Sequence, residues 1–165
     1  MMKRGLLPAA ALALLALFAC SPPFPRQLLD QTDRGVAFAD VAKNAESMKG
    51  KLVMLGGTIV ETRNLKEGTQ IEVLQKPLDG QGRPYLTDET QGRFLVVTPQ
   101  FLDNAVYHRG RNITVIAEIS GRRTQKLGEI DYPYPLLLAK AIHLWDPYAG
   151  SRFSVGVGVG VFHGY

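Results

Sequence analysis

The stretch NITVIAEIS, residues 112–120, decides the fold class of this 165-residue chain. Every second residue from Ile113 to Ile119 is apolar, and the residues between them are polar except for Ile116. A period of two is typical of a β-strand with one buried and one exposed face. We therefore expect a half-buried strand here, with Ile116 as the one apolar exception to its alternation.

Four more stretches rich in Val, Ile and Leu have strand character. We expect strands at residues 52–62, 69–75, 93–98 and 136–145. Glycine marks the connections between strands at Gly68, residues 80–84, Gly110 and Gly121. Gly56 and Gly57 fall inside the first of these strands, where glycine often marks a bulge or a corner.

The order of these elements favours a small barrel. Apolar residues recur at helical spacing in residues 36–48, which predicts one short amphipathic helix that stops near Gly50. The strands that follow have no helices between them, and a parallel sheet would need such helices. We therefore predict a mainly β protein, a small OB-like antiparallel β-barrel with one short N-terminal helix.

The N-terminus has the features of an export signal. Lys3 and Arg4 precede an apolar run that ends at Phe18, and the small residue Ala19 stands directly before Cys20. This arrangement resembles the lipobox of bacterial lipoproteins, in which the cysteine is acylated through sulfur and becomes the mature N-terminus. The alternative is a plain signal peptide or a membrane anchor, although the run is shorter than the ~20 residues of a spanning helix.

These features divide the chain into four parts. Residues 1–19 are the predicted lipoprotein signal peptide, and residues 20–35, with three prolines, are a lipidated tether. Residues 36–148 form the predicted barrel domain, and residues 149–165 are a tail rich in Gly and Val. Valines alternate with glycines in the tail, so it could pair with a barrel edge, pair with its copy in a weak homo-oligomer, or stay without fixed structure.

The composition argues against several kinds of chemistry. Two of the formal +4 charges lie on the signal peptide, so the mature chain is close to neutral and nucleic acid is not an expected partner. Cys20 is the only cysteine, which excludes a disulfide within the domain, and the histidines lack metal-ligand spacing. Glu129, Asp131 and His143 are the weak candidates for a catalytic cluster, and we expect no enzyme and no metal.

The segment Tyr-Pro-Tyr-Pro, residues 132–135, is the most distinctive local feature. Proline cannot donate to a strand ladder, so this segment should be extended at an edge or rim of the barrel. The candidate ligand-binding face comprises Tyr132, Tyr134, Trp145, Arg93 and Arg111. Its expected ligand is a lipid headgroup, a glycan or a peptide, and the alternative is that these aromatic residues only fill space in the structure.

An ordered series of short motifs carries a family resemblance. The series includes Gly50-Lys51, Gly56-Gly57-Thr58-Ile59, Pro77-Leu78-Asp79, Gly92-Arg93-Phe94, Phe101-Leu102-Asp103, Tyr132-Pro133-Tyr134-Pro135 and His143-Leu144-Trp145. With the lipobox, this series resembles the Slp family of starvation-inducible outer-membrane lipoproteins.

The resemblance implies a location more than a chemistry. It implies an outer-membrane lipoprotein with a structural or interaction role in the envelope, associated with stress, and it supplies no catalytic residue. The covalent lipid on Cys20 would be its only prosthetic group, and the lipoprotein processing and sorting machinery its partners. Ser21 follows the cysteine in place of the aspartate of inner-membrane lipoproteins, which favours the periplasmic face of the outer membrane. The alternative is a periplasmic module that binds a small envelope ligand.

Overall fold

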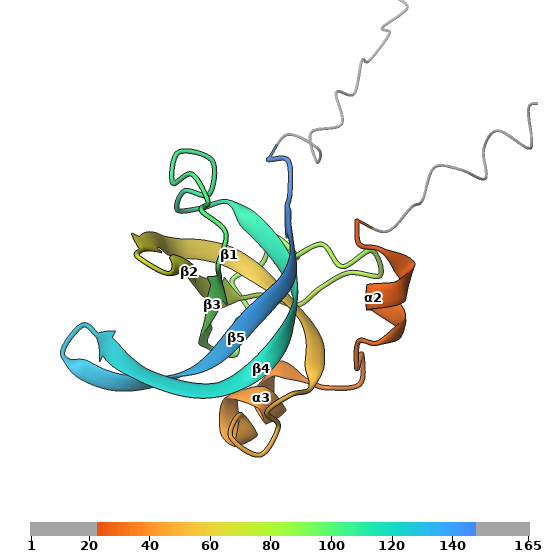
Figure 1. The fold of residues 1–165 in the computed structure, drawn as a ribbon, viewed down its shortest axis with the longest axis horizontal. Helices are drawn as coiled ribbons and strands as arrows, with labels where there is room; N and C mark the ends of the chain where they lie inside the picture. The colour runs from red at the N-terminus through yellow and green to blue at the C-terminus, as the bar shows by residue number, and fades with distance from the viewer. Residues whose placement is uncertain (1–22, 148–165) are drawn as a thin grey trace, which may run out of the picture.

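The computed structural model describes residues 23–147, whose five strands close into one barrel in the order β1-β2-β3-β5-β4 (Figure 1). The strands are β1 (Leu52–Leu65), β2 (Gly68–Gln75), β3 (Arg93–Thr98), β4 (Asn112–Leu127) and β5 (Ile130–Leu144). The OB-like barrel predicted from the sequence is confirmed.

One pair of neighbouring strands corrects the expectation of a wholly antiparallel barrel. β3 and β5 run parallel over three register positions, from Leu95 opposite Leu136 to Val97 opposite Leu138. The other four neighbouring pairs are antiparallel. A closed ring with an odd number of strands cannot alternate direction at every step, so one parallel pair is a geometric necessity.

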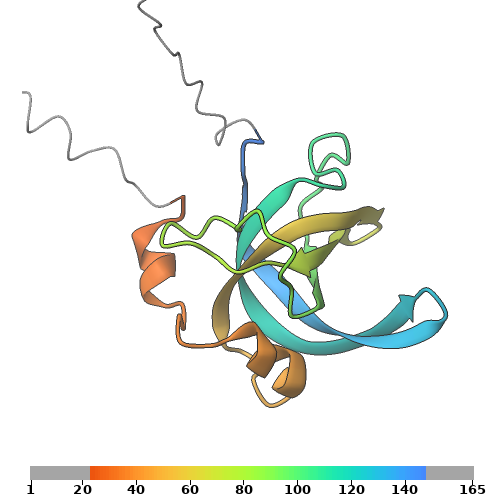
Figure 2. The ribbon, with the colours of Figure 1, turned by 180° about the vertical axis from the view of Figure 1, so that it is seen from behind.

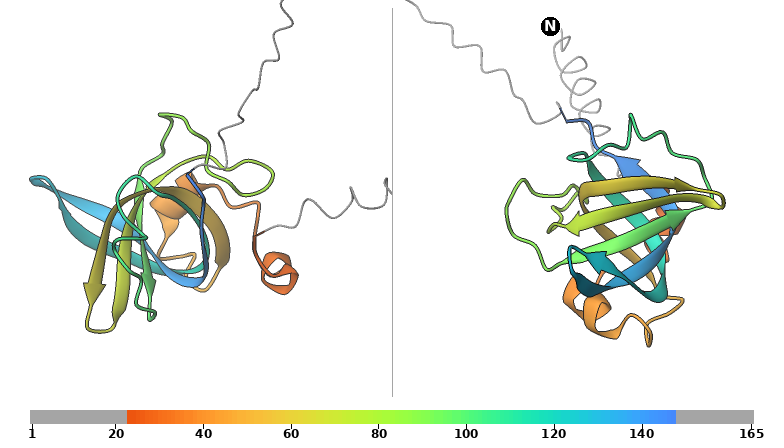
Figure 3. Two further views of the ribbon diagram at one scale, coloured as in Figure 1. Left: turned by 90° about the horizontal axis from the view of Figure 1, so that it is seen from above. Right: turned by 90° about the vertical axis from the view of Figure 1, so that its left-hand side faces the viewer.

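Gly121 is not the connection predicted from the sequence. It lies inside β4 with φ of 113°, at an irregularity of the β4–β5 register between Ile119 and Gly121. The chain turns instead after Leu127, at Gly128, whose φ is 62°. As a result β4 and β5 continue past the barrel as a two-stranded arm, defined here as residues 121–135, which projects in Figure 3.

Gly56 and Gly57 serve a close backbone approach. Here β1 pairs with β4 on one side and, from Gly57 onward, with β2 on the other. A Cβ atom on Gly57 would lie 1.9 Å from the Leu74 carbonyl oxygen, and one on Gly56 would lie 2.7 Å from that of Ile113. Of the bulge or corner predicted at these glycines, the bulge is not found there, because the irregularity of β1 lies between Ile59 and Glu61.

The barrel interior is filled with apolar side chains. The alternating residues of the 112–120 stretch point inward, and α3 (Phe38–Asn44) covers one end of the barrel (Figure 1). The Phe38 and Phe94 rings lie 5.8 Å apart between centroids across this end. The helix ends at Asn44, short of the predicted 36–48, and the chain continues in turns, with the Met48 N–H donating to the Asn44 carbonyl oxygen at 3.2 Å, as far as Gly50, whose φ is 83°.

The predicted tether is partly folded, which corrects the expectation for residues 23–35. The segment contains a short helix, α2 (Arg26–Asp30), and buries Phe24 and Leu29 against Ile116 of β4. The apolar exception in the alternation of β4 is therefore the contact for this N-terminal segment. This helix was not predicted, because a single helical turn is too short to show a repeat of apolar residues.

Two predictions fall partly or wholly outside the structure. The acylated Cys20 and the Gly/Val tail of residues 149–165 lie beyond the described residues. Within residues 23–147, no helix is long and apolar enough to cross a membrane.

Candidate functional site

Tyr132 and Tyr134 lie on one face of the arm because they are two residues apart on a strand. Pro133 and Pro135 lie opposite Thr124 and Arg122 of β4. On its other side β5 pairs with β3 only from Leu136 onward, so the prolines stand where no ladder on that side requires their missing N–H. The extended edge position predicted for this segment is confirmed.

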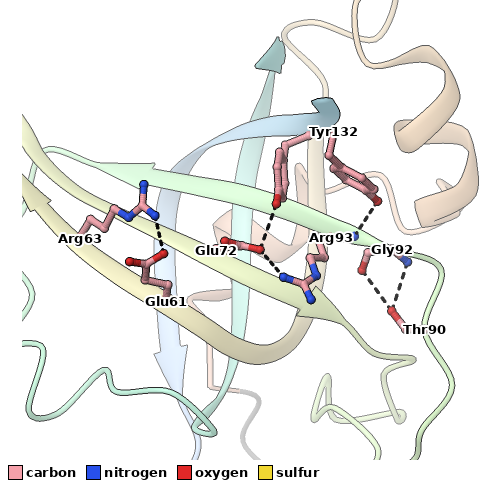
Figure 4. Close-up of polar contacts among 8 residues, drawn as sticks. Glu61, Arg63, Glu72, Thr90, Gly92, Arg93 and Tyr132 are labelled. Atoms are coloured by element: carbon pink, nitrogen blue, oxygen red, sulfur yellow. Dashed lines mark hydrogen bonds and ion pairs between the residues drawn. The ribbon is translucent and has the colours of Figure 1, made fainter. Parts of the chain in front are cut away.

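The two tyrosines of the arm contact a charged pair that links β2 to β3 (Figure 4). Arg93 Nη1 lies 2.6 Å from Glu72 Oε1, and the Tyr134 hydroxyl donates to the same oxygen at 3.1 Å. The Arg93 backbone N–H donates to the Tyr132 hydroxyl at 3.2 Å, and the two tyrosine rings meet edge to face at 4.6 Å. We call Glu72, Arg93, Tyr132 and Tyr134 the arm cluster.

The arm cluster is largely withdrawn from water. The side chains of Arg93 and Glu72 are 28% and 15% exposed, and Tyr134 as a residue is 1% exposed. Burial, and then the neighbouring Glu72 carboxylate, raise the pKa of Tyr134, so this phenol stays neutral and keeps its proton to donate. The carboxylate is thus held by one cation and one hydroxyl.

Charges next to the arm cluster are also paired. Arg63 donates to Glu61 at 2.6 Å on β1 (Figure 4), and this hydrogen bond lowers the pKa of Glu61. Arg123 of the arm donates to Gln70 Oε1 of β2 at 3.0 Å. The polar side chains on this outer face therefore satisfy one another, and none of these contacts requires a ligand.

A second cluster forms at the opposite end of β5, around Trp145. The indole Nε1 donates to Thr114 Oγ1 at 2.9 Å, and the Arg83 guanidinium stacks 5.0 Å from the ring centroid. Arg111 Nη2 donates to the Trp145 carbonyl oxygen at 3.0 Å. The His143 ring meets Trp145 edge to face at 4.4 Å. We call these five residues the tryptophan cluster.

His143 connects the tryptophan cluster to the N-terminal segment. Its ring also meets Phe24 edge to face, at 6.1 Å between centroids. Burial, and to a smaller degree the charge of Arg83, lower the pKa of His143, which favours the neutral ring. Arg111 adds one irregularity, since its buried Nε has no hydrogen-bond partner among the described residues.

The five predicted face residues therefore belong to two clusters. Tyr132, Tyr134 and Arg93 come together in the arm cluster, whereas Trp145 and Arg111 lie at the other end of β5. Binding by either set stays a prediction. Sequence reasoning missed Glu72, although an acidic residue inside the apolar stretch Ile71–Leu74 is a signal for a partner across the sheet.

The weak catalytic candidates do not converge. Asp131 lies near the arm tip and pairs with Lys126 at 2.8 Å, whereas His143 lies near the far end of β5 between two aromatic rings. Glu129 lies in the turn between β4 and β5. Among residues 23–147 no group of three or more His, Cys, Asp or Glu side chains is placed to hold a metal ion.

Two clefts lie beside the barrel, and the larger one adjoins the tryptophan cluster, because its lining residues Phe24 and Gly82 contact His143 and Thr114. The larger, about 700 Å³, separates the N-terminal segment from the β2–β3 loop, residues 76–92. The smaller, about 570 Å³, lies beside the start of β1 and includes Glu118 and Lys140, which pair at 2.8 Å. Neither cleft is lined by the predicted face residues. No sequence pattern predicts either cleft, because each is formed by segments distant in sequence.

An OB-like barrel preceded by a segment that resembles a lipobox matches the class of lipid-anchored proteins of the bacterial envelope. This chain belongs to the outer membrane lipoprotein Slp family, whose model matches residues 17–157. It is accordingly an outer-membrane lipoprotein, as the sequence series predicted.

Relatives include an uncharacterized protein of Haemophilus influenzae, 34% identical over 58% of this chain and 52% of that protein. The uncharacterized lipoprotein YeaY of Escherichia coli is 30% identical over 58% of this chain and 49% of its own length. The outer membrane protein Slp of Escherichia coli is 26% identical over 83% of this chain and 73% of its own length. The chain thus spans about half the length of the first two relatives.

Among solved structures, a small single-stranded DNA-binding protein from Streptomyces coelicolor aligns with a TM-score of 0.38 and 18% identity. The alignment covers 63% of this chain and 99% of that protein. A likeness of this degree carries no argument about function.

Proposed function

We propose that this lipoprotein is a non-catalytic interaction module held against the periplasmic face of the outer membrane by acylated Cys20. The observation that carries the proposal is the packing of Phe24, which is 5% exposed and lies only four positions after the predicted anchor. An extended chain advances at most about 3.6 Å per residue, so Cys20 lies within about 11 Å of Pro23. The barrel is then mounted on the bilayer and does not hang from a tether.

A mounted barrel has a fixed orientation. Its N-terminal side, with α2, faces the bilayer, and the β1–β2 hairpin lies on the opposite side of the barrel (Figures 1 and 2). The hairpin is joined to the loop of residues 99–111 by a hydrogen bond from Asn64 to Asn104 at 3.0 Å. Phe101 in that loop is 75% exposed. This side is the one available to a protein of the periplasm.

The anchor is tested by Cys20→Ala. We expect the variant to accumulate as unprocessed precursor outside the outer-membrane fraction, because two or more acyl chains are what makes such anchoring stable. Cys20 is the only cysteine, so no other thiol can substitute for it. Mature variant protein in the outer membrane would contradict the proposal.

The interaction role is tested by a photo-crosslinking side chain at Phe101. We expect discrete adducts with an envelope protein in cells that carry the anchored protein, and loss of those adducts when Cys20→Ala is added. Adducts that are absent from the anchored protein, or unchanged without the anchor, would contradict an interaction role at the membrane. The stress association comes from the family resemblance, and it predicts that expression rises on starvation.

The alternative function is small-ligand binding on the outer face of β2 and β3, which is a recurrent binding surface of OB barrels. Tyr132 and Arg93 lie there, but the arm cluster already satisfies its charged groups. The alternative predicts that Tyr132→Ala abolishes co-purification of a small molecule with the membrane-extracted protein, as judged by intact-mass analysis. A preparation with no bound molecule would leave the interaction role as the better supported function.

A further inference from the structure

The cleft of about 700 Å³ between the N-terminal segment and the β2–β3 loop has the size of a ligand site. Figure 2 shows α2 and this loop facing each other beside the barrel. The apolar part of its lining comprises Phe24, Leu29, Phe38, Met54, Leu55 and Leu78. Its surface is therefore suited to a hydrocarbon chain.

The outer wall of the cleft is a preformed hairpin. Leu78 forms a β-bridge with Pro84, and the Asp79 carboxylate accepts from the backbone N–H groups of Gln81 and Arg83, each at 2.8 Å. Thr114 of β4 donates to the Gly82 carbonyl oxygen at 2.5 Å, which ties the hairpin tip to the barrel. The cleft is thus bounded by bonded elements on both sides.

Two cations line the cleft. Lys76 is 8% exposed and donates from Nζ to the Thr87 carbonyl oxygen at 2.5 Å. Arg34 is exposed, and its guanidinium makes no hydrogen bond or ion pair with any other residue between positions 23 and 147. Asp79 is the acidic residue of the lining, and its carboxylate accepts hydrogen bonds from the backbone of its own loop. The cleft therefore combines an apolar lining with net positive charge.

The position of the cleft gives it access to membrane lipid. Pro23 lines it, and Cys20 stands three positions earlier, so the acylated residue lies within about 11 Å of Pro23. This step rests on the proposed mounting of the barrel at the bilayer. A positively charged surface held there attracts anionic headgroups.

We propose that this cleft binds an anionic phospholipid of the bilayer, with its phosphate at Arg34 and Lys76 and one acyl chain along Phe24, Met54 and Leu78. The charge of the cleft selects an anionic headgroup over a neutral one. The mature chain ahead of Pro23 is three residues long and cannot fill the cleft by itself.

The test uses the full-length lipidated protein in phosphatidylcholine vesicles doped with phosphatidylglycerol that carries a diazirine on one acyl chain. After irradiation, mass spectrometry of the peptides should find adducts at Met54 or in residues 76–83. Gly80→Trp should remove most of these adducts, because Gly80 lines the cleft and a Cβ there meets no atom within 4 Å. Leu65→Trp, at the exposed β1–β2 hairpin, is the matched control and should leave the yield unchanged.

The charge requirement has its own variants. Arg34→Gln should lower the phosphatidylglycerol adduct about fivefold at low salt, the change expected for loss of one cation near an anionic group. Lys66→Gln, which removes an exposed cation of the β1–β2 hairpin, should have no effect. Equal labelling by diazirine-bearing phosphatidylcholine would overturn the proposed headgroup selection.

Flotation of the same vesicles separates this proposal from the anchor. Protein that does not float with the vesicles contradicts the mounting on which the proposal rests. Protein that floats but carries no adduct in the cleft contradicts lipid binding alone. Capture of the C-terminal tail or of the Cys20 acyl chain by a photo-crosslinking side chain at Leu78, with no phospholipid captured, would also overturn it.

Discussion

The two ends of β5 hold their neighbours by different chemistry. In the arm cluster a carboxylate, a guanidinium and a phenol fix the arm to β2 and β3, and Tyr134 is fully buried. In the tryptophan cluster a half-buried indole is held by a threonine hydroxyl, an edge-to-face histidine ring and a guanidinium that lies over the indole. The first end depends on a charge pair, and the second on ring packing.

The difference shows how one set of residue types can serve two attachments. The arm cluster fastens a strand extension that the barrel does not need for closure, since β4 pairs with β1 only as far as Glu118. The tryptophan cluster fastens the β2–β3 loop and, through His143 and Phe24, the N-terminal segment. Perturbing the second end should therefore disturb the cleft, whereas perturbing the first should not.

Tyr134→Ala should have the largest effect on stability. Truncation of a buried aromatic side chain costs about 3–5 kcal/mol, so we expect the free energy of unfolding to fall by about 3 kcal/mol. Trp145→Ala should cost less, because part of the indole is already in water. Denaturant unfolding of both variants measures the difference, and a larger loss for Trp145→Ala would reverse the comparison.

Arg93→Gln should come next. It leaves the Glu72 carboxylate with the Tyr134 hydroxyl and removes its cation, which should cost about 2 kcal/mol. Adding Glu72→Gln should recover part of the loss, since no unpaired charge then remains. A double-mutant cycle from denaturant unfolding measures this coupling, and strictly additive losses would show that the charge pair does not stabilise the arm cluster.

Acidification should act first on the tryptophan cluster, because a histidine titrates at higher pH than a carboxylate. Burial lowers the pKa of folded His143 below its usual 6.5, so on acidification the unfolded chain takes up a proton before the folded protein does. The free energy of unfolding should therefore fall between about pH 7 and pH 5, and His143→Gln should flatten that slope. His108→Gln, at an exposed histidine, is the control. If the pH dependence of the free energy of unfolding is unchanged in His143→Gln, His143 is not its cause.

Lys126→Ala at the tip of the arm should have the smallest effect. Its ion pair with Asp131 is exposed on both sides, with side chains 65% and 67% accessible. Exposed pairs of this kind contribute about 0–1 kcal/mol, so we expect less than about 0.5 kcal/mol by denaturant unfolding. A loss as large as that of Arg93→Gln would mean that the arm is held from its tip.

Much of the fold could be predicted from the alternation of apolar residues. The observed bounds of β3 are the predicted 93–98, and the inward-facing residues of the 112–120 stretch lie in the core. The β4 half of the arm beyond Gly121 was missed, because none of residues 122–127 is buried and they show no alternation of apolar and polar residues. A positive φ at Gly121 serves an irregular ladder as well as a turn, so the sequence there did not distinguish the two.

The candidate site was predictable in composition but not in arrangement. The Tyr-Pro-Tyr-Pro segment predicted a position at the edge of the sheet, because proline lacks the N–H that a paired strand requires. Nothing local placed Arg93 with Tyr132 or Arg111 with Trp145. Those partnerships depend on the register between β3, β4 and β5, which pair residues far apart in the chain.

The amino-acid sequence alone predicted an export signal with an acylated cysteine, and it determined five strands able to close into a barrel. These follow from short-range patterns, since a lipobox and a period of two are complete within about ten residues. Only the tertiary structure decided the parallel β3–β5 pair, the partner of Ile116 and the cleft beside the N-terminal segment. Each of these arises where ring closure brings distant segments together, and burial of Phe24 and Leu29 has meaning only once β4 offers them a surface.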